Sequence, residues 1–382
     1  MLTLPPLSLY VHIPWCVQKC PYCDFNSHAL RGGIPEEDYV EALLADLQAD
    51  LHHVQGRQLH SIFIGGGTPS LFSAEAIARL LRGIAARIPF ADDIEITLEA
   101  NPGTVEADKF AGFARAGVNR LSIGVQSLQP DKLAALGRIH GPAEAIRAAE
   151  LAHGCGVNSF NLDLMHGLPG QSLDDALSDL RRAIACNPQH LSWYQLTIEP
   201  NTLFASKPPV LPEDETLWAI QEAGHALLLE AGYRQYEISA YAKPGFEARH
   251  NLNYWHFGDY LGIGCGAHGK ISHPLSGRIY RTVKVKHPKG YLDPDQPYLF
   301  DCSQVELEDR PFEYFMNRLR LFRPVPKAEF SARTGLAPQQ VQAFLADAVR
   351  LGLIGEDDSA WRVTEQGHRY LNQLLAMLLD AD

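Results

Sequence analysis

Short β-rich runs alternate with helical patterns along the first two thirds of the chain, at a spacing of roughly thirty residues. Each run is apolar enough to be buried on both faces, as the strands of a parallel sheet are. Asp, Glu, Ser and Thr gather where the helical patterns begin, and Gly or Asn stands near several of their ends. Repeated strand–helix units predict a parallel sheet or barrel. The strands are expected at residues 7–13, 61–67, 94–100, 120–126, 159–165, 191–197 and 236–242.

The alternation stops near residue 243, which suggests a core domain of residues 1–243. Residues 244–304 are rich in Gly, His and aromatic side chains and are expected to form a connecting segment. Residues 305–382 show amphipathic helical patterns, then a strand, an acidic turn, a strand and a final helix. This order predicts a small winged-helix-like C-terminal domain of helices with a few strands.

Charge and hydropathy exclude several classes of protein. The net charge is −12 and no basic run is present, which disfavours a nucleic-acid partner and makes packing or protein contact the better role for the C-terminal domain. The first residues lack the basic region of a signal peptide, and no apolar run approaches the roughly 20 residues of a membrane helix. We therefore expect a soluble, cytoplasmic protein without a transmembrane segment.

Three of the seven cysteines, Cys16, Cys20 and Cys23, directly follow the first expected strand. The C-terminal ends of strands carry the active sites of parallel α/β folds. Structural zinc normally takes four protein ligands in two pairs, and no second pair is present here. Three thiolates suit a [4Fe–4S] cluster with one iron open to another ligand. The alternatives are a chance grouping and a redox pair with a spare thiol. The other cysteines are scattered singly at Cys155, Cys186, Cys265 and Cys302.

The spacing CX3CX2C after a first strand resembles the radical S-adenosylmethionine (SAM) superfamily. The resemblance implies an α/β fold with a partial (β/α)6 barrel of the TIM type. It also implies that the open iron chelates the amino and carboxylate groups of SAM, and that the reduced cluster cleaves SAM to a 5′-deoxyadenosyl radical.

Several positions at the expected strand ends match SAM contacts in that superfamily. The sequence GGGTPS (65–70) follows the second strand, and the superfamily holds the SAM amino group with such a loop, before a helix that Ser73 is expected to cap. A polar residue at the end of a buried strand needs a ligand or a partner, although each one alone could equally be a capping or ion-pair residue. The resemblance assigns SAM binding to Tyr10, Tyr22, Gly66, Gly67, Thr68, Glu99, Gln126, Arg138 and Asp163.

Two features distinguish branches within the oxygen-independent coproporphyrinogen III oxidase-like family. The sequence YVHIPWCVQKCPYCDFNSH resembles the HemW haem chaperones, whereas the oxidases, HemN, carry a further cysteine where this chain has Phe25. The sequence HNLNYW fits the HNxxYW pattern of the chaperones. It makes His250 a candidate axial ligand of haem iron, beside Asn251, Tyr254 and Trp255. The alternative is a structural histidine with a packed tryptophan.

A further glycine-rich run, GIGCGAHG (262–269), lacks the strand–helix context of a dinucleotide site. It resembles a glycine loop of the same family near which a second SAM can lie, but His268 departs from the small or apolar residue expected there. Cys265 is expected to be a small buried residue rather than a ligand.

The resemblance implies a haem chaperone. Such a protein would bind one [4Fe–4S] cluster, SAM and haem as cargo, and would deliver haem to apo-haemoproteins such as respiratory enzymes, including membrane-bound ones, as a monomer or weak dimer. The rival from another class is a coproporphyrinogen III oxidase that works by hydrogen abstraction, against which Phe25 argues. A third possibility is an iron–sulfur protein that no longer cleaves SAM. The sequence does not decide whether SAM is cleaved, and hence whether the protein is an enzyme.

Overall fold

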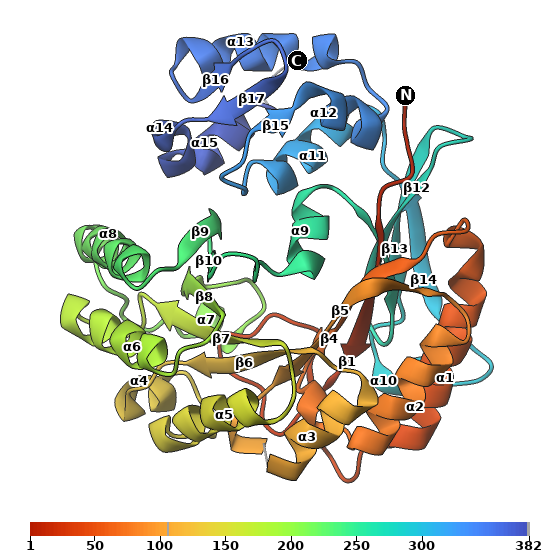
Figure 1. Cartoon of the computed structure of the whole chain (residues 1–382), viewed down its shortest axis with the longest axis vertical. Coiled ribbons are helices and arrows are strands. Elements are labelled where there is room, and N and C mark those ends of the chain that lie inside the picture. The colour runs from red at the N-terminus through yellow and green to blue at the C-terminus, as the bar shows by residue number, and fades with distance from the viewer. Residues whose placement is uncertain (105–106, 380–382) are drawn as a thin grey trace.

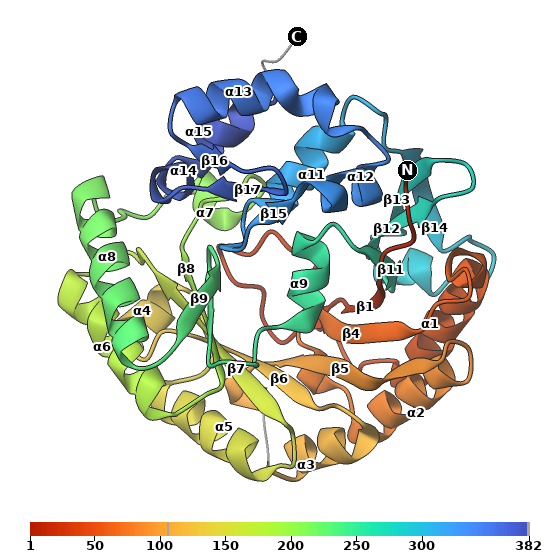
Figure 2. The same ribbon diagram turned by 45° about the horizontal axis from the view of Figure 1, so that its top comes forward.

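The computed structural model describes residues 1–104 and 107–379. One large sheet runs through the first part of the chain, and helices cover its outer face (Figure 1). Its middle strands are parallel, and strands at both ends are antiparallel. The two edge strands, β14 and β9, do not pair in the described part of the chain, so the sheet forms an open, partial barrel (Figure 2). The strand order is β14-β13-β12-β11-β1-β4-β5-β6-β7-β8-β10-β9.

The parallel strands carry apolar residues toward the helices and polar residues toward the barrel interior. In β1, Leu7, Leu9 and Val11 are fully buried in the core beneath the helices, while Ser8 bonds the inward-facing Ser61 of β4 at 2.7 Å. These strands are β11 (Asp259–Ile263), β1 (Leu7–Ile13), β4 (Leu59–Gly66), β5 (Phe90–Ala100), β6 (Arg120–Gln126), β7 (Ser159–His166) and β8 (His190–Gln195).

Each parallel strand from β1 to β8 is followed by one or more helices, as the alternation predicts. Ser73 caps one of them by accepting the Ala76 N–H at 3.1 Å, which confirms the expected cap. The helices are α1 (Glu36–Asp50), α2 (Ala74–Ala85), α3 (Ala107–Ala116), α4 (Pro130–Ala135), α5 (Pro142–Gly154), α6 (Leu173–Ala185), α7 (Leu203–Ser206) and α8 (Asp214–Glu230). Short elements between them are β2 (Trp15–Cys16), β3 (His28–Ala29), η1 (Leu51–His53), η2 (Pro69–Leu71) and η3 (Pro102–Thr104).

The predicted α/β class with a partial barrel is confirmed, and β1 and β6 begin and end at the predicted residues. The expected single strand at residues 236–242 is wrong. It is a hairpin of β9 (Arg234–Glu237) and β10 (Ala240–Ala242) that pairs antiparallel with β8. The Glu237 carboxylate accepts the Ser239 N–H at 3.0 Å, which closes the turn that the apolar pattern concealed.

Residues 244–304 add four strands to the large sheet and also form two short helices. The strand β11 pairs in parallel with β1, so this segment continues the barrel wall directly beside the first strand. The following strands then lead away from the barrel as an antiparallel meander. These elements are α9 (Arg249–Trp255), β12 (His268–His273), β13 (Arg278–Lys284), α10 (Pro288–Tyr291) and β14 (Leu299–Gln304).

Helix α9, which carries the HNxxYW sequence, packs against the inner face of the barrel (Figure 2). The His250 ring is hydrogen-bonded to Ser61 Oγ at 2.9 Å, and Asn253 donates to Ser8 Oγ at 2.9 Å. The Glu95 carboxylate of β5 accepts the N–H groups of Arg249 and His250, both at 3.0 Å, which satisfies the start of the helix. The inward serines of β1 and β4 therefore hold α9 inside the barrel.

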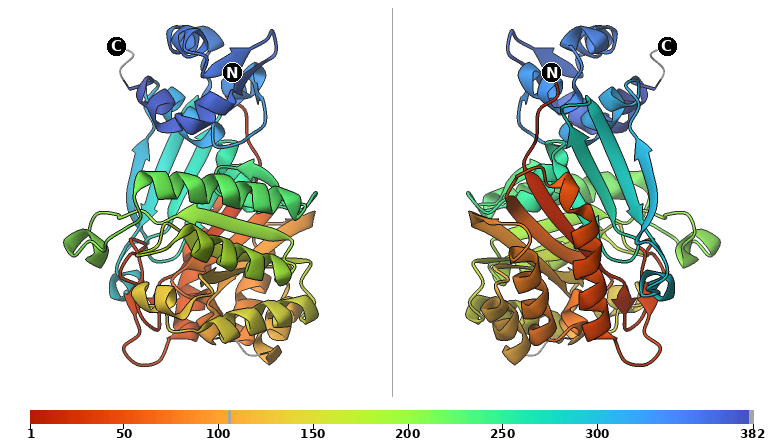
Figure 3. Two further views of the ribbon diagram at one scale, coloured as in Figure 1. Left: turned by 90° about the vertical axis from the view of Figure 1, so that its left-hand side faces the viewer. Right: turned by 90° about the vertical axis from the view of Figure 1, so that its right-hand side faces the viewer.

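The last part of the chain forms a small domain with its own aromatic core. Phe315, Phe330 and Trp361 are buried against one another, and Arg318 donates to Glu329 at 2.7 Å beside them. The domain packs at the end of the molecule away from the cysteine loop (Figure 3). Its elements are α11 (Arg310–Arg318), β15 (Val325–Pro326), α12 (Lys327–Thr334), η4 (Pro338–Val341), α13 (Gln342–Arg350), β16 (Ile354–Glu356), β17 (Ala360–Val363), α14 (Glu365–Arg369) and α15 (Leu371–Ala376).

A buried ionic group joins the added strands to the first helix. Lys284 of β13 donates to Asp46 at 2.6 Å and to Asp50 at 2.7 Å, both on α1. Asp46 also accepts the Gly264 N–H at 3.1 Å and the Tyr291 hydroxyl at 2.7 Å. One carboxylate thus anchors the turn after β11, the strand β13 and helix α10.

Lys284→Ala is expected to destabilise the fold by about 3 kcal/mol or more, because it leaves two carboxylates without their buried cation. Chemical unfolding of the full chain measures this change. Lys327→Ala is the matched control, because it removes a pair with Glu356 that is partly exposed and should cost less than about 1 kcal/mol. Equal effects of the two substitutions would contradict the role given to Lys284.

Candidate functional site

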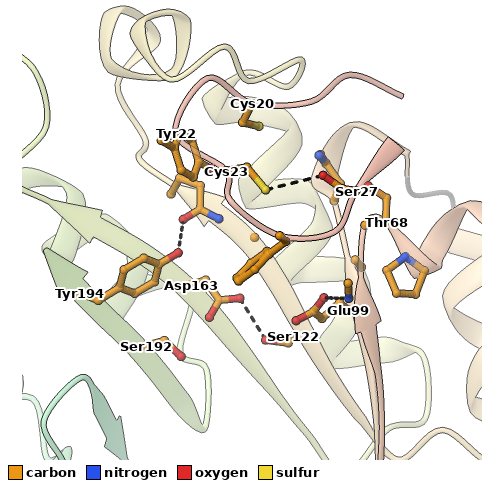
Figure 4. Close-up of a pocket in the computed structure, with 18 of the residues that line it drawn as sticks. Cys20, Tyr22, Cys23, Ser27, Thr68, Glu99, Ser122, Asp163, Ser192 and Tyr194 are labelled. Carbon is orange, nitrogen blue, oxygen red and sulfur yellow. Dashed lines mark hydrogen bonds between the residues drawn. The ribbon is translucent and has the colours of Figure 1, made fainter. Parts of the chain in front are cut away.

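The three clustered cysteines lie on the loop that follows β1 and line one cavity of about 520 Å³ (Figure 4). Cys16 ends β2, and the Cys23 N–H donates to Cys20 O at 3.2 Å, which closes a turn within the loop. All three thiols are free and partly buried. The thiols therefore share one cavity, although each has a different place on the loop.

The surroundings of the thiols favour their anionic form once a metal is bound. Arg138 Nη1 lies 3.6 Å from Cys20 Sγ, and the Ser27 hydroxyl lies 3.8 Å from Cys23 Sγ. Burial raises the pKa of the Cys16 and Cys23 thiols, so both are protonated in the metal-free protein. Metal binding by these thiolates therefore releases protons.

This donor set fits an iron–sulfur cluster with three protein ligands. None of the other cysteines lines the cavity, and Cys265 is fully buried, as expected, with its thiol donating to Lys286 O at 2.9 Å. No three His, Cys, Asp or Glu side chains among the described residues converge on a single ion. The thiolates of a cluster each bind a separate iron and need no such convergence.

The glycine loop after β4 lies directly against the cysteine loop. The N–H groups of Gly67 and Thr68 donate to Ile13 O and Trp15 O, both at 2.7 Å. Gly66 has φ +114°, and a Cβ added to Gly67 would lie 2.5 Å from Trp15 O. The glycines are thus required for the close approach of the two loops, and all three residues line the cavity.

Two carboxylates reach the cavity, Glu99 from near the end of β5 and Asp163 from the middle of β7 (Figure 4). Glu99 accepts the Gly66 N–H at 3.0 Å, and burial, reinforced by the charge of Asp163, raises its pKa to about 7. Asp163 accepts Ser122 Oγ at 3.0 Å and the Asn161 amide at 2.8 Å, and burial also raises its pKa. Their buried charge favours a ligand that brings hydrogen-bond donors.

Gln126 and Arg138 complete the wall near the cysteines. Gln126 adopts φ +67°, and its amide oxygen accepts the Tyr194 hydroxyl at 3.0 Å. Arg138 Nη2 donates to Gly124 O at 2.6 Å, while its Nε is buried without a partner. An unpartnered buried donor beside a cavity is the kind of group that a polar ligand satisfies.

The structure brings eight of the nine expected SAM residues into the cavity. Tyr10 is the exception, because it lies on the inner face of β1 with its hydroxyl 2.9 Å from His12 Nδ1 and does not line the cavity. The other eight are Tyr22, Gly66, Gly67, Thr68, Glu99, Gln126, Arg138 and Asp163.

The HNxxYW residues divide between the cavity and the space behind it. Asn251 and Trp255 line the cavity, whereas His250 and Tyr254 do not. His250 is 1% exposed, and its ring nitrogens are hydrogen-bonded to Ser61 and, at 2.7 Å, to the Tyr254 hydroxyl. Burial lowers its pKa to about 3, so the ring is neutral.

Several residues of the cavity were missed by the sequence analysis. Ser192 and Tyr194 lie within β8 and within the expected strand 191–197, where their alternation with the buried Leu191 and Trp193 was a usable signal. Glu237 and Ser239 come from the β9–β10 hairpin, and Arg320 comes from the turn after α11. Arg320 donates to Glu237 at 3.1 Å and lies 4.3 Å from the Trp255 ring centre. No local pattern marks these three, because only the folded chain brings the C-terminal domain to the cavity.

Comparison with known families and proteins gives a consistent result. Residues 10–183 match the model of the radical SAM superfamily, and residues 305–370 match the HemN C-terminal domain. The chain is 62% identical over 379 residues to the heme chaperone HemW of Escherichia coli. The matched region covers 99% of this chain and 100% of that relative. It is 60% identical to the heme chaperone HemW of Haemophilus influenzae, with 99% of both chains covered.

Among solved structures, the coproporphyrinogen III oxidase HemN from Escherichia coli superposes with a TM-score of 0.83. The superposition covers 98% of this chain and 90% of that one, at 24% sequence identity. This likeness shows a shared fold. No helix in the described part of the chain has the length and apolar character needed to span a membrane.

The raised pKa of Glu99 predicts a pH-dependent cost to folding. In the folded protein this carboxyl group holds its proton up to a pKa of about 7, whereas in the unfolded chain it loses the proton near pH 4.5. The free energy of unfolding therefore falls as the pH rises from about 4.5 to 7, and it does not recover above pH 7. Glu99→Gln removes the cost. In the SAM-free, cluster-loaded protein, the stability advantage of the variant should grow by about 1 kcal/mol between pH 6 and pH 8.

Anaerobic chemical unfolding at the two pH values measures this advantage, with Glu75→Gln, a first-turn residue of α2 outside the cavity, as the control. The same variant should bind SAM at least tenfold more weakly. An advantage that does not change with pH would show that Glu99 is ionised throughout.

Proposed function

The chain belongs to the HemW family of haem chaperones within the radical SAM superfamily, and on this premise we propose that it carries haem to apo-haemoproteins under the control of a [4Fe–4S] cluster and SAM. The observation that carries the proposal is the cavity itself. Three free thiols, a glycine loop and the carboxylates of Glu99 and Asp163 meet there, and Phe25 stands where an oxidase would have a further thiol.

In this proposal, Cys16, Cys20 and Cys23 hold the cluster. The bound cluster supplies an electron donor and one open iron position for SAM. Arg138 stabilises the thiolate of Cys20, to which it already lies close. The loop at Gly66 and the adjoining Glu99 orient the amino acid end of SAM, and Asp163 and Gln126 accept hydrogen bonds from the rest of the molecule.

Cys16→Ser, Cys20→Ser and Cys23→Ser should each lose the cluster, seen as the loss of its visible absorption and of bound iron and sulfide after anaerobic reconstitution. Cys186→Ser is the matched control, because Cys186 is a partly buried cysteine at the end of α6 and lies outside the cavity. Full iron content in any of the three loop variants would remove that cysteine from the ligand set.

The rival function, oxidative decarboxylation of coproporphyrinogen, is disfavoured by Phe25. Its side chain is 64% exposed at the cavity, and a phenyl ring has no electron pair for a metal and no thiol for redox chemistry. The fold it shares with HemN does not decide the matter, because one fold supports different functions.

Haem transfer and oxidase turnover can be measured on one preparation. The cluster-loaded protein should bind haem saturably at one per chain and pass it to an apo-haemoprotein, read by the appearance of the acceptor's haem spectrum or activity. The same preparation with SAM and a reductant should form no protoporphyrinogen from coproporphyrinogen. Turnover of coproporphyrinogen without saturable haem binding would reverse the assignment.

The residues His250, Asn251, Tyr254 and Trp255 stay a candidate haem site. In the folded state described above, an iron atom could reach His250 only after the ring gives up a hydrogen bond to Ser61 or Tyr254. His250→Ala would therefore remove a candidate iron ligand and also the hydrogen bonds that hold α9 to the barrel, so a loss of haem binding alone would not separate the two roles. The distinction needs a second site for comparison.

A further inference from the structure

A second, larger cavity of about 970 Å³ is lined by helix α8 and by the C-terminal domain. It is a groove open along one side of the molecule, and its volume is within the range of cofactor-sized ligand sites. It contains three imidazoles, four large aromatic side chains and two guanidinium groups. Of these groups, only the ring of Tyr194 also lines the cysteine cavity.

One wall is a continuous face of α8. Leu217, Trp218, Gln221, His225 and Leu229 follow one another at intervals of one, three and four residues and all line the groove. Trp218 is 46% exposed, although a ring of this size is normally well covered. This face of α8 thus presents an apolar strip with an imidazole in it.

The opposite wall belongs to the C-terminal domain. The His368 ring stacks on Phe322 with centroids 4.1 Å apart and planes 13° apart. Its Nδ1 lies 3.2 Å from Thr364 O and its Nε2 is buried, so the ring contributes its flat stacked pair rather than a free nitrogen. Arg369 of the same helix lies 5.4 Å from the centre of the Trp218 ring. The domain therefore brings a flat aromatic pair and a cation to the groove.

His166 lies at the base of the groove and is 1% exposed, with its ring centroid 4.4 Å from that of Trp193. Its Nδ1 is buried and makes no hydrogen bond. His225 is better placed for a ligand, because its Nδ1 lies 3.1 Å from the Tyr241 hydroxyl, which fixes the ring and leaves Nε2 for another partner. Burial lowers the pKa of all three imidazoles, so they are neutral at pH 7.

The charges at the rim restrict the orientation of a ligand. Glu365 pairs with Arg369 at 2.6 Å, and Asp214 and Glu222 also line the groove. Arg234 has no ion pair among the described residues, so an anionic end of a ligand is best placed beside it. A flat apolar molecule with carboxylates at one edge and a metal that binds neutral imidazole matches these walls.

We propose that this groove binds the carried haem, with His225 as the imidazole that reaches the iron, the His368–Phe322 pair as a flat wall and Arg234 beside the propionates. The inference rests on the proposed carrier function and locates its cargo. It assigns His250 a positioning role, in which the ring holds α9 to the barrel. Since Tyr194 and Ser239 line both cavities, the haem would lie one layer of side chains from the SAM site.

The test is an anaerobic haem titration of the cluster-loaded full chain, followed by the Soret band. His225→Ala should weaken binding about tenfold, and the His225→Ala, Arg234→Ala double variant should lose saturable binding. His60→Ala, which removes an exposed imidazole outside both cavities, should bind as the wild type does. His250→Ala should keep haem affinity within about threefold wherever circular dichroism shows an intact fold.

Free imidazole provides a readout that structural damage cannot imitate. Added to the His225→Gly protein, it should restore the wild-type Soret position. A His225→Ala, Arg234→Ala variant that binds haem within twofold of wild type would overturn the groove, and so would a lost Soret band that imidazole does not restore. Absence of saturable binding by the wild-type chain would instead contradict the carrier function itself, so the two failures are distinguishable.

Discussion

The parallel alignment of β1 and β4–β8 is the constraint on which the site depends. Parallel strands place their carboxyl ends at one edge, so residues far apart in sequence come to line one cavity. The cysteine loop follows β1, the glycine loop follows β4, Glu99 stands near the end of β5, and Asp163 reaches the cavity from the middle of β7. No short-range interaction could assemble this set, because only the sheet joins its members.

The same alignment creates an interior that must be filled with polar groups. Ser8 and Ser61 point inward, and an empty space beside them would leave hydroxyls without partners. Helix α9 fills this space, and its His250 and Asn253 side chains hydrogen-bond Ser61 and Ser8. The position of α9 therefore follows from the needs of the sheet, and it also decides that Asn251 and Trp255 face the cavity while His250 faces the wall.

Repeating patterns made much of this fold and site predictable. The strands β1 and β6 were found to the residue, and most expected SAM contacts line the cavity, because strand ends are visible in sequence. The strand β11 was missed because its pairing with β1 joins residues about 250 positions apart. Tyr10 was placed by resemblance alone, and its inward position on β1 leaves it behind the cavity wall.

The two cavities share a wall, so under the proposed function the cofactor site and the cargo site would be in contact. Tyr194 lines both cavities, and its hydroxyl donates to Gln126 on the cluster side. An occupant of one cavity that shifts this ring changes the shape of the other. Because coupling between two binding sites is reciprocal, any effect of SAM on the affinity for haem must equal the effect of haem on the affinity for SAM. Loading of the cofactor site and release of the cargo can then be linked without chemical turnover.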